Sequence, residues 1–196
     1  MRAAGRATRD RILAAAKDEF TQYGFAGARL NRIASTARAS KERLYSYFTS
    51  KEQLFEAVVA QWVADAPYVV PLTAENVPGY VEGLFDNFVA DPRGARLQRW
   101  IELEAPQGLS DDHVLRRIFR AKLVEVRRGQ QAGVIDASWN PMDLVTMLTE
   151  IALSMAAGSS VLSDIAGEPR AGDSLAERRA AAVEAARRLV APSSSH

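Results

Sequence analysis

Alanine is the commonest residue in this chain, and segments in which apolar and polar residues alternate are scarce. Alanine occurs 34 times among 196 residues. It has the highest intrinsic helix propensity, whereas strict alternation marks a half-buried strand, so this pattern favours helices almost everywhere. No segment makes a convincing strand. The sequence therefore predicts an all-α protein.

Apolar residues recur at helical spacing in nine segments. Thr8, Ser40 and Asn140 stand where side chains cap helix N-termini, and Gly24 is placed to end the first helix in a left-handed conformation. Residues 158–173 are rich in Gly, Pro and Ser and are expected to form a loop. The expected helices span residues 8–23, 29–37, 40–48, 51–65, 77–90, 94–105, 110–132, 141–158 and 174–190.

Composition excludes several classes of function. The chain has no cysteine, which removes disulfides, thiolate zinc sites and cysteine nucleophiles. Imidazole comes only from His113 and His196, so neither a His-rich metal site nor His-centred catalysis is expected. A di-iron helical bundle needs Glu-x-x-His pairs, but the residue three before His113 is Ser110. We therefore expect no enzyme activity, no metal and no cofactor.

Charge is distributed unevenly along the chain. Residues 1–61 carry 11 Lys or Arg against 6 Asp or Glu, whereas residues 62–196 carry 14 against 18. A basic front end on an acidic body suggests that the first third binds a polyanion. A chance excess of solvated arginines explains the same numbers, so charge alone does not decide between the two.

Residues 29–48 match a helix-turn-helix. Two short helices are joined by a tight turn, and the second begins at Ser40. A reading helix fits the major groove only when the preceding helix supports it from behind. Ile33 and Ala37 should therefore pack against Leu44 and Phe48, while the polar residues 41–46 face the groove. Lys51 begins the next helix, where its ammonium and nearby amides can meet a phosphate.

These segments resemble the tetracycline-repressor (TetR) family of bacterial transcription regulators over residues 8–60. The run "LYSYFTSKEQLF" is close to the family's signature. The matching residues are Phe20, Tyr23, Gly24, Phe25, Leu30, Ile33, Ala34, Ala37, Ser40, Leu44, Tyr45, Tyr47, Phe48, Ser50, Lys51, Leu54 and Phe55. The resemblance implies an N-terminal three-helix DNA-binding domain over residues 1–50 and a larger helical domain for ligand binding and dimerisation over 51–196, with about nine helices in all.

The resemblance also implies which residues meet DNA. Bases are read chiefly by Lys41, Glu42, Arg43 and Ser46, while Tyr45, Tyr47 and Lys51 grip phosphates and sugars. The full expected set is Arg29, Asn31, Ser40, Lys41, Glu42, Arg43, Tyr45, Ser46, Tyr47 and Lys51. Taken without the motif, the two tyrosines read equally as half-buried core aromatics and the charged residues as solvated surface. The basic face of helix 110–132 is expected to be solvated rather than a second DNA contact.

Two positions depart from the family pattern. Ala28 and Arg29 stand where a Thr or Ser pair is usual, so the second helix lacks its usual side-chain cap, and Arg29 is free to meet a phosphate. Arg38 stands where the turn usually has Gly. If that position still needs a positive φ, Arg38 is strained there.

Aromatic and Met side chains in the larger domain suggest a cavity for a small, mainly apolar effector. Besides Glu104, the side chains of Glu102, Asn87 and Thr146 are expected to supply polar groups to this cavity. They would suit a hydrogen-bond donor or a cationic group on the ligand. Each of these side chains alternatively just fills the core. The expected lining is Trp62, Phe85, Phe88, Trp100, Glu104, Phe119 and Met147.

The last two expected helices are predicted to form a homodimer seam, as a four-helix bundle built from two copies. The residues expected there are Leu148, Ile151, Met155, Ala182, Val183, Ala186 and Leu189. A two-fold dimer sets its reading helices about 34 to 36 Å apart and predicts a near-palindromic operator on double-stranded DNA.

The expected protein is therefore a regulator, most simply a repressor, that leaves its operator when the effector binds. The N-terminus lacks a secretory signal, and no apolar run reaches the roughly 18 residues that cross a bilayer, so a cytoplasmic, nucleoid-associated protein without membrane contact is expected. An unregulated DNA-binding or interaction module remains the alternative.

Overall fold

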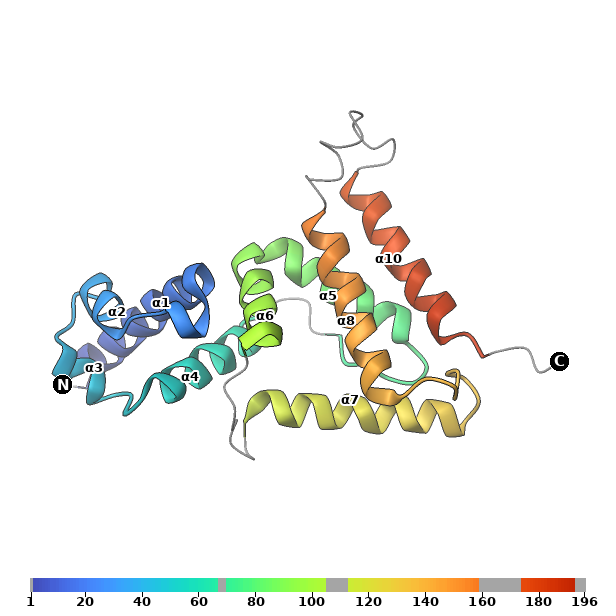
Figure 1. The fold of residues 1–196 in the computed structure, drawn as a ribbon, viewed down its shortest axis with the longest axis horizontal. Coiled ribbons are helices and arrows are strands. Elements are labelled where there is room, and N and C mark those ends of the chain that lie inside the picture. The colour runs from blue at the N-terminus through green and yellow to red at the C-terminus, as the bar shows by residue number, and fades with distance from the viewer. Residues whose placement is uncertain (1, 67–69, 105–112, 159–173, 193–196) are drawn as a thin grey trace. The chain divides into compact units, whose positions relative to one another are not determined.

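The computed structural model describes residues 2–66, 70–104, 113–158 and 174–192. These residues form nine helices and no strand (Figure 1). The helices are α1 (Arg2–Gly27), α2 (Leu30–Thr36), α3 (Lys41–Tyr45), α4 (Lys51–Ala64), α5 (Val77–Ala90), α6 (Pro92–Glu104), α7 (Val114–Gln131), α8 (Pro141–Ala157) and α10 (Leu175–Val190). The all-α prediction is confirmed.

Side-chain caps set several helix starts. Ser50 caps α4 by accepting from the Gln53 amide, and Asn140 caps α8 in the same way with proline in the first turn. Ser174 and Glu177 cap α10 reciprocally, a capping box that satisfies two amides at once. These residues fix the helix boundaries because the first amides of a helix have no partner within it.

Several predicted helix boundaries are wrong, including the end of the helix expected over 40–48, which lies at Tyr45. The first helix begins at Arg2 rather than Thr8, because residues 2–7 contain three alanines and no proline, and the single Gly5 does not end the helix. Gly24 has the expected positive φ of 70°, but one more turn follows it to Gly27. The helix expected from residue 110 begins at Val114. Its expected cap at Ser110, and nearly all of the loop expected over 158–173, lie outside the described residues.

The chain divides into two compact units, comprising residues 1–66 with 93–116, and residues 67–92 with 117–196. The first unit therefore keeps α4 and α6 together with the three N-terminal helices. This division differs from the expected boundary after residue 50, because α4 packs against α1.

An aromatic cluster forms the centre of the first unit. The Phe55 ring of α4 meets Phe20 and Phe25 edge-on, at centroid distances of 5.0 and 5.3 Å. Leu44 of α3 and Ile33 of α2 are buried as well. Edge-to-face aromatic contacts add stabilisation beyond burial of area, so this cluster fixes α4 against the kinked end of α1.

Helices α5, α8 and α10 pack side by side in the second unit (Figure 1). Phe85, Leu144 and Leu148 are buried there, and small Ala182 and Ala186 allow α10 to approach closely. Arg179 of α10 reaches α5, where its guanidinium lies 2.6 Å from carboxylate oxygens of both Glu82 and Asp86.

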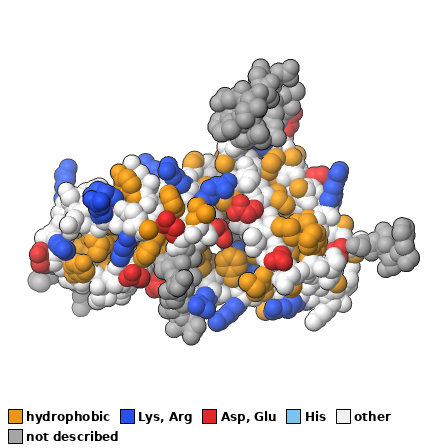
Figure 2. Space-filling view, in the orientation of Figure 1, with side chains coloured by type: hydrophobic (Ala, Val, Ile, Leu, Met, Phe, Trp, Pro, Cys, Tyr) orange, Lys and Arg blue, Asp and Glu red, His pale blue; other side chains and the backbone are white. Residues whose placement is uncertain are grey.

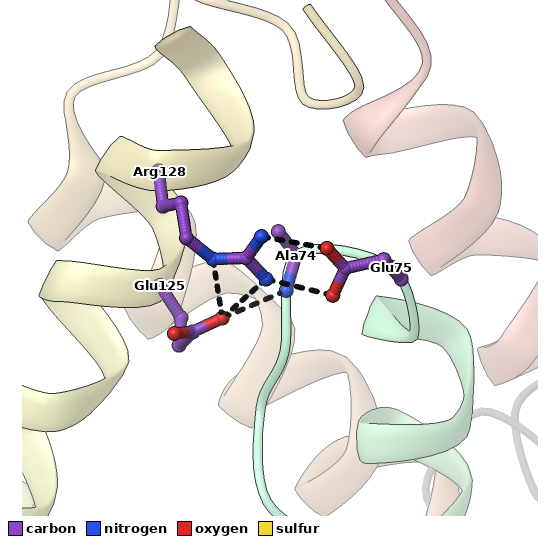
Figure 3. Close-up of polar contacts among 4 residues, drawn as sticks. All are labelled: Ala74, Glu75, Glu125 and Arg128. Carbon is purple, nitrogen blue, oxygen red and sulfur yellow. Dashed lines mark hydrogen bonds and ion pairs between the residues drawn. The ribbon is translucent and has the colours of Figure 1, made fainter. Parts of the chain in front are cut away.

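The segment before α5 is attached to α7 by Arg128. Its guanidinium contacts both Glu75 oxygens at 2.7 Å and Glu125 at 2.8 Å, and Glu125 also accepts from the Ala74 amide (Figure 3). The guanidinium's hydrogen bonds lower the pKa of both carboxyl groups. The start of α5 is thus held by a shared network rather than by one exposed ion pair, which contributes little alone.

Candidate nucleic-acid interface

Helix α3 presents its polar residues outward. The Ser40 hydroxyl caps it by accepting from the Arg43 amide at 3.1 Å, as predicted. Leu44 is fully buried, whereas the expected base-reading residues are exposed: Lys41, Glu42, Arg43 and Ser46. The Ser46 hydroxyl donates to the Arg43 carbonyl at 2.7 Å, so its proton already has an acceptor. A short helix anchored by one leucine therefore exposes a charged face.

Arg38 closes the turn between α2 and α3 with a φ of 51°, the only positive φ among the described non-glycine residues. Its amide donates to Ser35 O at 3.1 Å, and the Ala39 amide donates to Ala34 O at 3.0 Å. These two bonds make a Schellman motif, whose left-handed position is usually glycine. The turn thus needs the conformation that the sequence pattern indicated, and an arginine adopts it.

Helix α2 lacks a side-chain cap on Arg29, as predicted. Glu19 of α1 supplies the missing acceptor: its carboxylate is 8% exposed and accepts from the Arg29 amide at 2.8 Å. The same oxygen accepts from Arg32 Nε at 2.8 Å, and the Arg32 guanidinium lies 4.2 Å from the Tyr23 ring centroid. The side chains of Arg29 and Asn31 are exposed. Sequence reasoning missed Glu19, since its partners are brought to it only by folding.

The two tyrosines of the motif have different surroundings. Tyr45 is 40% exposed, with Lys41 Nζ 5.9 Å from its ring centroid. Tyr47 is half-buried, and its hydroxyl donates to Gly5 O at 3.0 Å. Arg43 covers the Tyr47 ring at 5.1 Å. Tyr45 is therefore free to meet a phosphate, while the hydroxyl proton of Tyr47 already has a backbone acceptor.

Lys51 stands at the first turn of α4, close to the kinked end of α1. Its ammonium donates to Ala26 O at 3.3 Å and lies 4.8 Å from the Phe25 ring centroid. Burial lowers the pKa of this ammonium, against the opposing effect of carboxylates that include Glu104. An ammonium carries three donors, so the bond to Ala26 leaves two for a phosphate.

Helix α6 is attached to the same end of α1. The Trp100 indole donates to Thr21 O at 3.0 Å, and the Glu104 carboxylate accepts from the Ala26 amide at 3.1 Å. Both are expected from the sequence to line an effector pocket, and in the structure both contact α1 in the first unit. Glu102 accepts from Gln98 at 2.7 Å. These carboxylates therefore already have donors within the first unit.

The other expected pocket residues are divided between the units. Trp62 is half-buried in the first unit. In the second unit Phe85 and Phe88 are buried, and Phe119 and Met147 are half-buried. The pocket itself stays a prediction.

Tyr80 of α5 was not singled out from the sequence. It is 3% exposed, and its buried hydroxyl has no hydrogen-bond partner among the described residues. Lys122 Nζ lies 5.1 Å from the ring centroids of both Tyr80 and Phe119. A buried donor without an acceptor is costly, so the Tyr80 hydroxyl is a polar group in an apolar setting that calls for a physical explanation.

The expected dimer residues also fall into two groups. Leu148, Ala182 and Ala186 are fully buried within one chain, which leaves these side chains no surface for a partner. The remaining four keep part of their surface exposed: Ile151, Met155, Val183 and Leu189. The amphipathic pattern alone could not separate these groups, because α8 and α10 also pack on α5.

Lys and Arg side chains are distributed over α1 to α4 on the visible face, interleaved with apolar ones (Figure 2).

Among the described residues, no group of three or more His, Asp or Glu is arranged to hold a metal ion. No helix in the described ranges is both long and apolar enough to cross a bilayer.

A supported short helix with an exposed charged face, held by a Schellman turn behind it, defines a helix-turn-helix DNA-binding protein. Comparison with known families gives the particular family. Residues 12–58 match the model of bacterial regulatory proteins of the tetR family, and residues 76–188 match the tetracyclin repressor-like C-terminal domain. The chain belongs to the TetR family.

Similar proteins are transcriptional regulators rather than enzymes. The HTH-type transcriptional repressor SCO4008 of Streptomyces coelicolor is 35% identical over 147 residues, covering 74% of this chain and 77% of its own. The HTH-type transcriptional regulator RutR of Escherichia coli is 51% identical over 57 residues, or 27% of each chain. The chain is therefore a DNA-binding transcriptional regulator.

Solved structures share the fold. The transcriptional regulator SCO4942 from Streptomyces coelicolor superposes with a TM-score of 0.73 at 37% identity, covering 93% of this chain and 98% of that one. A TetR family regulator from Marinobacter aquaeolei superposes with a TM-score of 0.70 at 22% identity, covering 97% and 99%.

Proposed function

We propose that this regulator is a repressor that binds a near-palindromic operator as a homodimer and releases it when a small, mainly apolar molecule binds the second unit. The observation that carries the DNA part is α3, with Leu44 buried and its charged residues exposed. The similarity to a protein named as a repressor supports repression over activation. We infer that the protein is cytoplasmic and associated with the nucleoid, where its operator lies.

Base reading and phosphate binding are assigned to different residues. Arg43 is exposed on α3 and carries the forked guanidinium that pairs with guanine in the major groove. Lys51 is a point charge at the start of α4 and has donors left for phosphate. Lys51→Ala should weaken binding to every duplex and lower the salt slope by about 1, whereas Arg43→Ala should mainly relax base preference. Equal behaviour of the two variants would contradict this division.

The effector is assigned to the second unit, next to Tyr80. The buried hydroxyl lacks an acceptor, and Lys122 is held over the Tyr80 and Phe119 rings. These groups favour a ligand with an acceptor atom on an apolar body. The carboxylates first expected to hold a cationic ligand have donors elsewhere.

The test is thermal denaturation with a panel of apolar molecules that differ in having or lacking an acceptor. Acceptor-bearing members should raise Tm in the native chain and lose most of this effect in Tyr80→Phe. No shift with any member would leave an unregulated DNA-binding module as the better description.

The homodimer is assigned to α8 and α10, through the residues that one chain leaves partly exposed. Ile151 and Met155 lie one turn apart on α8, and Val183 and Leu189 lie on α10. Sedimentation should show a dimer at micromolar concentration, and Met155→Glu should dissociate it because a charge would be buried at the seam. If the native chain is a monomer at that concentration, the proposed homodimer fails. The near-palindromic operator then fails too, because it is inferred from the two-fold symmetry of the dimer.

Release of DNA follows from linkage. In one state of the dimer the two reading helices are one DNA turn apart, and in the other they are not. A ligand that binds the second state more tightly must lower DNA affinity, typically with a coupling free energy of about 1 to 3 kcal/mol. Linkage is reciprocal, so operator DNA must lower effector affinity by the same factor.

A further inference from the structure

The first turns of α1 carry two exposed arginines beside the reading helix. Arg6 and Arg9 are three residues apart and so share a face of α1. The helix start at Arg2 places Arg6, which lies outside the helix expected over residues 8–23, on the same helix as Arg9. Neither forms an ion pair within the described part of the chain, although Asp10 lies one turn beyond Arg6.

Other arginines of the described structure show what these two lack. Arg93 pairs with Asp18 at 2.7 Å, and Arg32 pairs with Glu19. Arg11, two residues beyond Arg9, donates to Ala37 O and to Thr8 Oγ1, both at 3.2 Å. Arg9 only lies over the Phe48 ring, 5.5 Å from its centroid, which leaves the donors of its guanidinium available.

Tyr47 fastens this part of α1 to the end of α3. Its hydroxyl donates to Gly5 O across 42 residues of sequence, at 3.0 Å. Its ring lies 5.1 Å from the Arg43 guanidinium. One tyrosine therefore contacts the base-reading helix on one side and the residue before Arg6 on the other. Tyr47 thus links the cation Arg43 of α3 to the start of α1, which carries Arg6 and Arg9.

We propose that Arg6 and Arg9 bind phosphates of the duplex strand that borders the groove occupied by α3, and that Tyr47 is a positioning residue for them rather than a phosphate ligand. Arg6 follows the residue that Tyr47 contacts, and Arg9 lies over Phe48, which comes after the end of α3. Both arginines are therefore beside α3 rather than on its exposed face, where they would meet the sugar-phosphate backbone that borders the groove. Arginine forks match phosphate oxygens in pairs, which suits this role.

The first test measures binding to a random-sequence 30-base-pair duplex over a range of KCl, by fluorescence anisotropy. A phosphate contact acts on any duplex, so this probe does not depend on the operator. The Arg6→Ala, Arg9→Ala double variant should bind about 3- to 30-fold more weakly at low salt. Its salt slope should fall by about 0.9 for each phosphate that the variant no longer neutralises.

Arg96→Ala is the matched control. Arg96 is an exposed arginine of α6 in the same unit. The α6 residues on either side of it contact α1 at Asp18 and Thr21, at least roughly 20 Å along the helix from Gly5 at about 1.5 Å per residue. It should bind like the native chain. If the double variant is indistinguishable from Arg96→Ala, the two arginines are solvated surface residues and the proposal fails.

A double-mutant cycle separates positioning from direct contact. Tyr47→Phe keeps the ring and removes the bond to Gly5. If Tyr47 positions the arginines, Tyr47→Phe weakens binding, and Arg6→Ala costs clearly less in that background than in the native chain. Additive losses would mean that Tyr47 meets DNA by itself, and an unchanged affinity for Tyr47→Phe would mean that it does neither; both results overturn its positioning role. Equal Tm values would show that the variants are folded.

Discussion

Arg38 occupies a backbone conformation that costs an L-residue free energy. Its φ is 51°, and both Schellman bonds around it depend on that value. A left-handed conformation costs a non-glycine residue about 1 kcal/mol or more, of which the greater chain entropy of unfolded glycine cancels a part. Arg38→Gly should therefore raise the free energy of unfolding by about 0.5 to 1 kcal/mol in urea denaturation.

The control for Arg38→Gly is Ser35→Gly, at an exposed position in the preceding helix. Glycine is the poorer helix former there, so this change should lower stability by about 0.5 kcal/mol. If both Arg38→Gly and Ser35→Gly lower the free energy of unfolding, Arg38 is not strained in the turn.

We expect His113 to make the free energy of unfolding depend on pH. The side chain is 4% exposed; its Nδ1 accepts from the Leu115 amide at 3.1 Å, and its Nε2 has no partner within the described residues. Burial lowers its pKa below the usual 6.5, with Glu56 opposing and Arg116 adding to the shift. The unfolded chain therefore takes up this proton first, and stability falls as pH decreases below about 6.5.

The pH effect is measured as the urea midpoint at pH 7.5 and 5.5 in the native chain and in His113→Gln, which cannot take up the proton. The native chain should lose more stability on acidification than the variant does. Equal losses would assign the pH dependence to carboxyl groups instead.

Helices α1 and α6 pack closely against each other at Gly24. Its φ of 70° and ψ of −179° suit glycine almost alone. A Cβ there would lie 2.6 Å from Glu104 Oε2 and 2.8 Å from Trp100 Cε3. Gly24→Ala should lower the free energy of unfolding by about 2 to 5 kcal/mol, combining backbone strain with overpacking.

Gly133→Ala is the comparison for this change, since Gly133 shares the φ of 70° but has no atom within 4 Å of an added Cβ. It should cost only about 1 to 2 kcal/mol. If Gly24→Ala lowers the free energy of unfolding no more than Gly133→Ala does, α6 can move away from the added methyl group at little cost. Close packing of α6 on α1 would then not be important for stability.

Local signals predicted most helix boundaries, and tertiary contacts explain what they missed. Ser40 and Asn140 cap helices within three residues, so a reader of the sequence can place them. The cap that Glu19 gives α2 and the bond from Tyr47 to Gly5 join residues 10 and 42 apart. Trp100 has the apolar pattern of a pocket residue, but spacing does not say which helix its face meets. The position of α3 was thus predictable, whereas the contacts of the side chains around it were not.

The proposed function of the whole molecule depends on α3 reading the bases of duplex DNA. The direct measurement is the affinity for a duplex recovered by genomic footprinting against a scrambled duplex at the same salt, for the native chain and for Arg43→Ala. The native chain should prefer the recovered duplex by about 1,000-fold or more. Arg43→Ala should reduce that preference by about 5- to 150-fold while leaving binding to the scrambled duplex nearly unchanged. Equal affinity of the native chain for both duplexes, or full discrimination by Arg43→Ala, would contradict the assignment of base reading to this helix and residue.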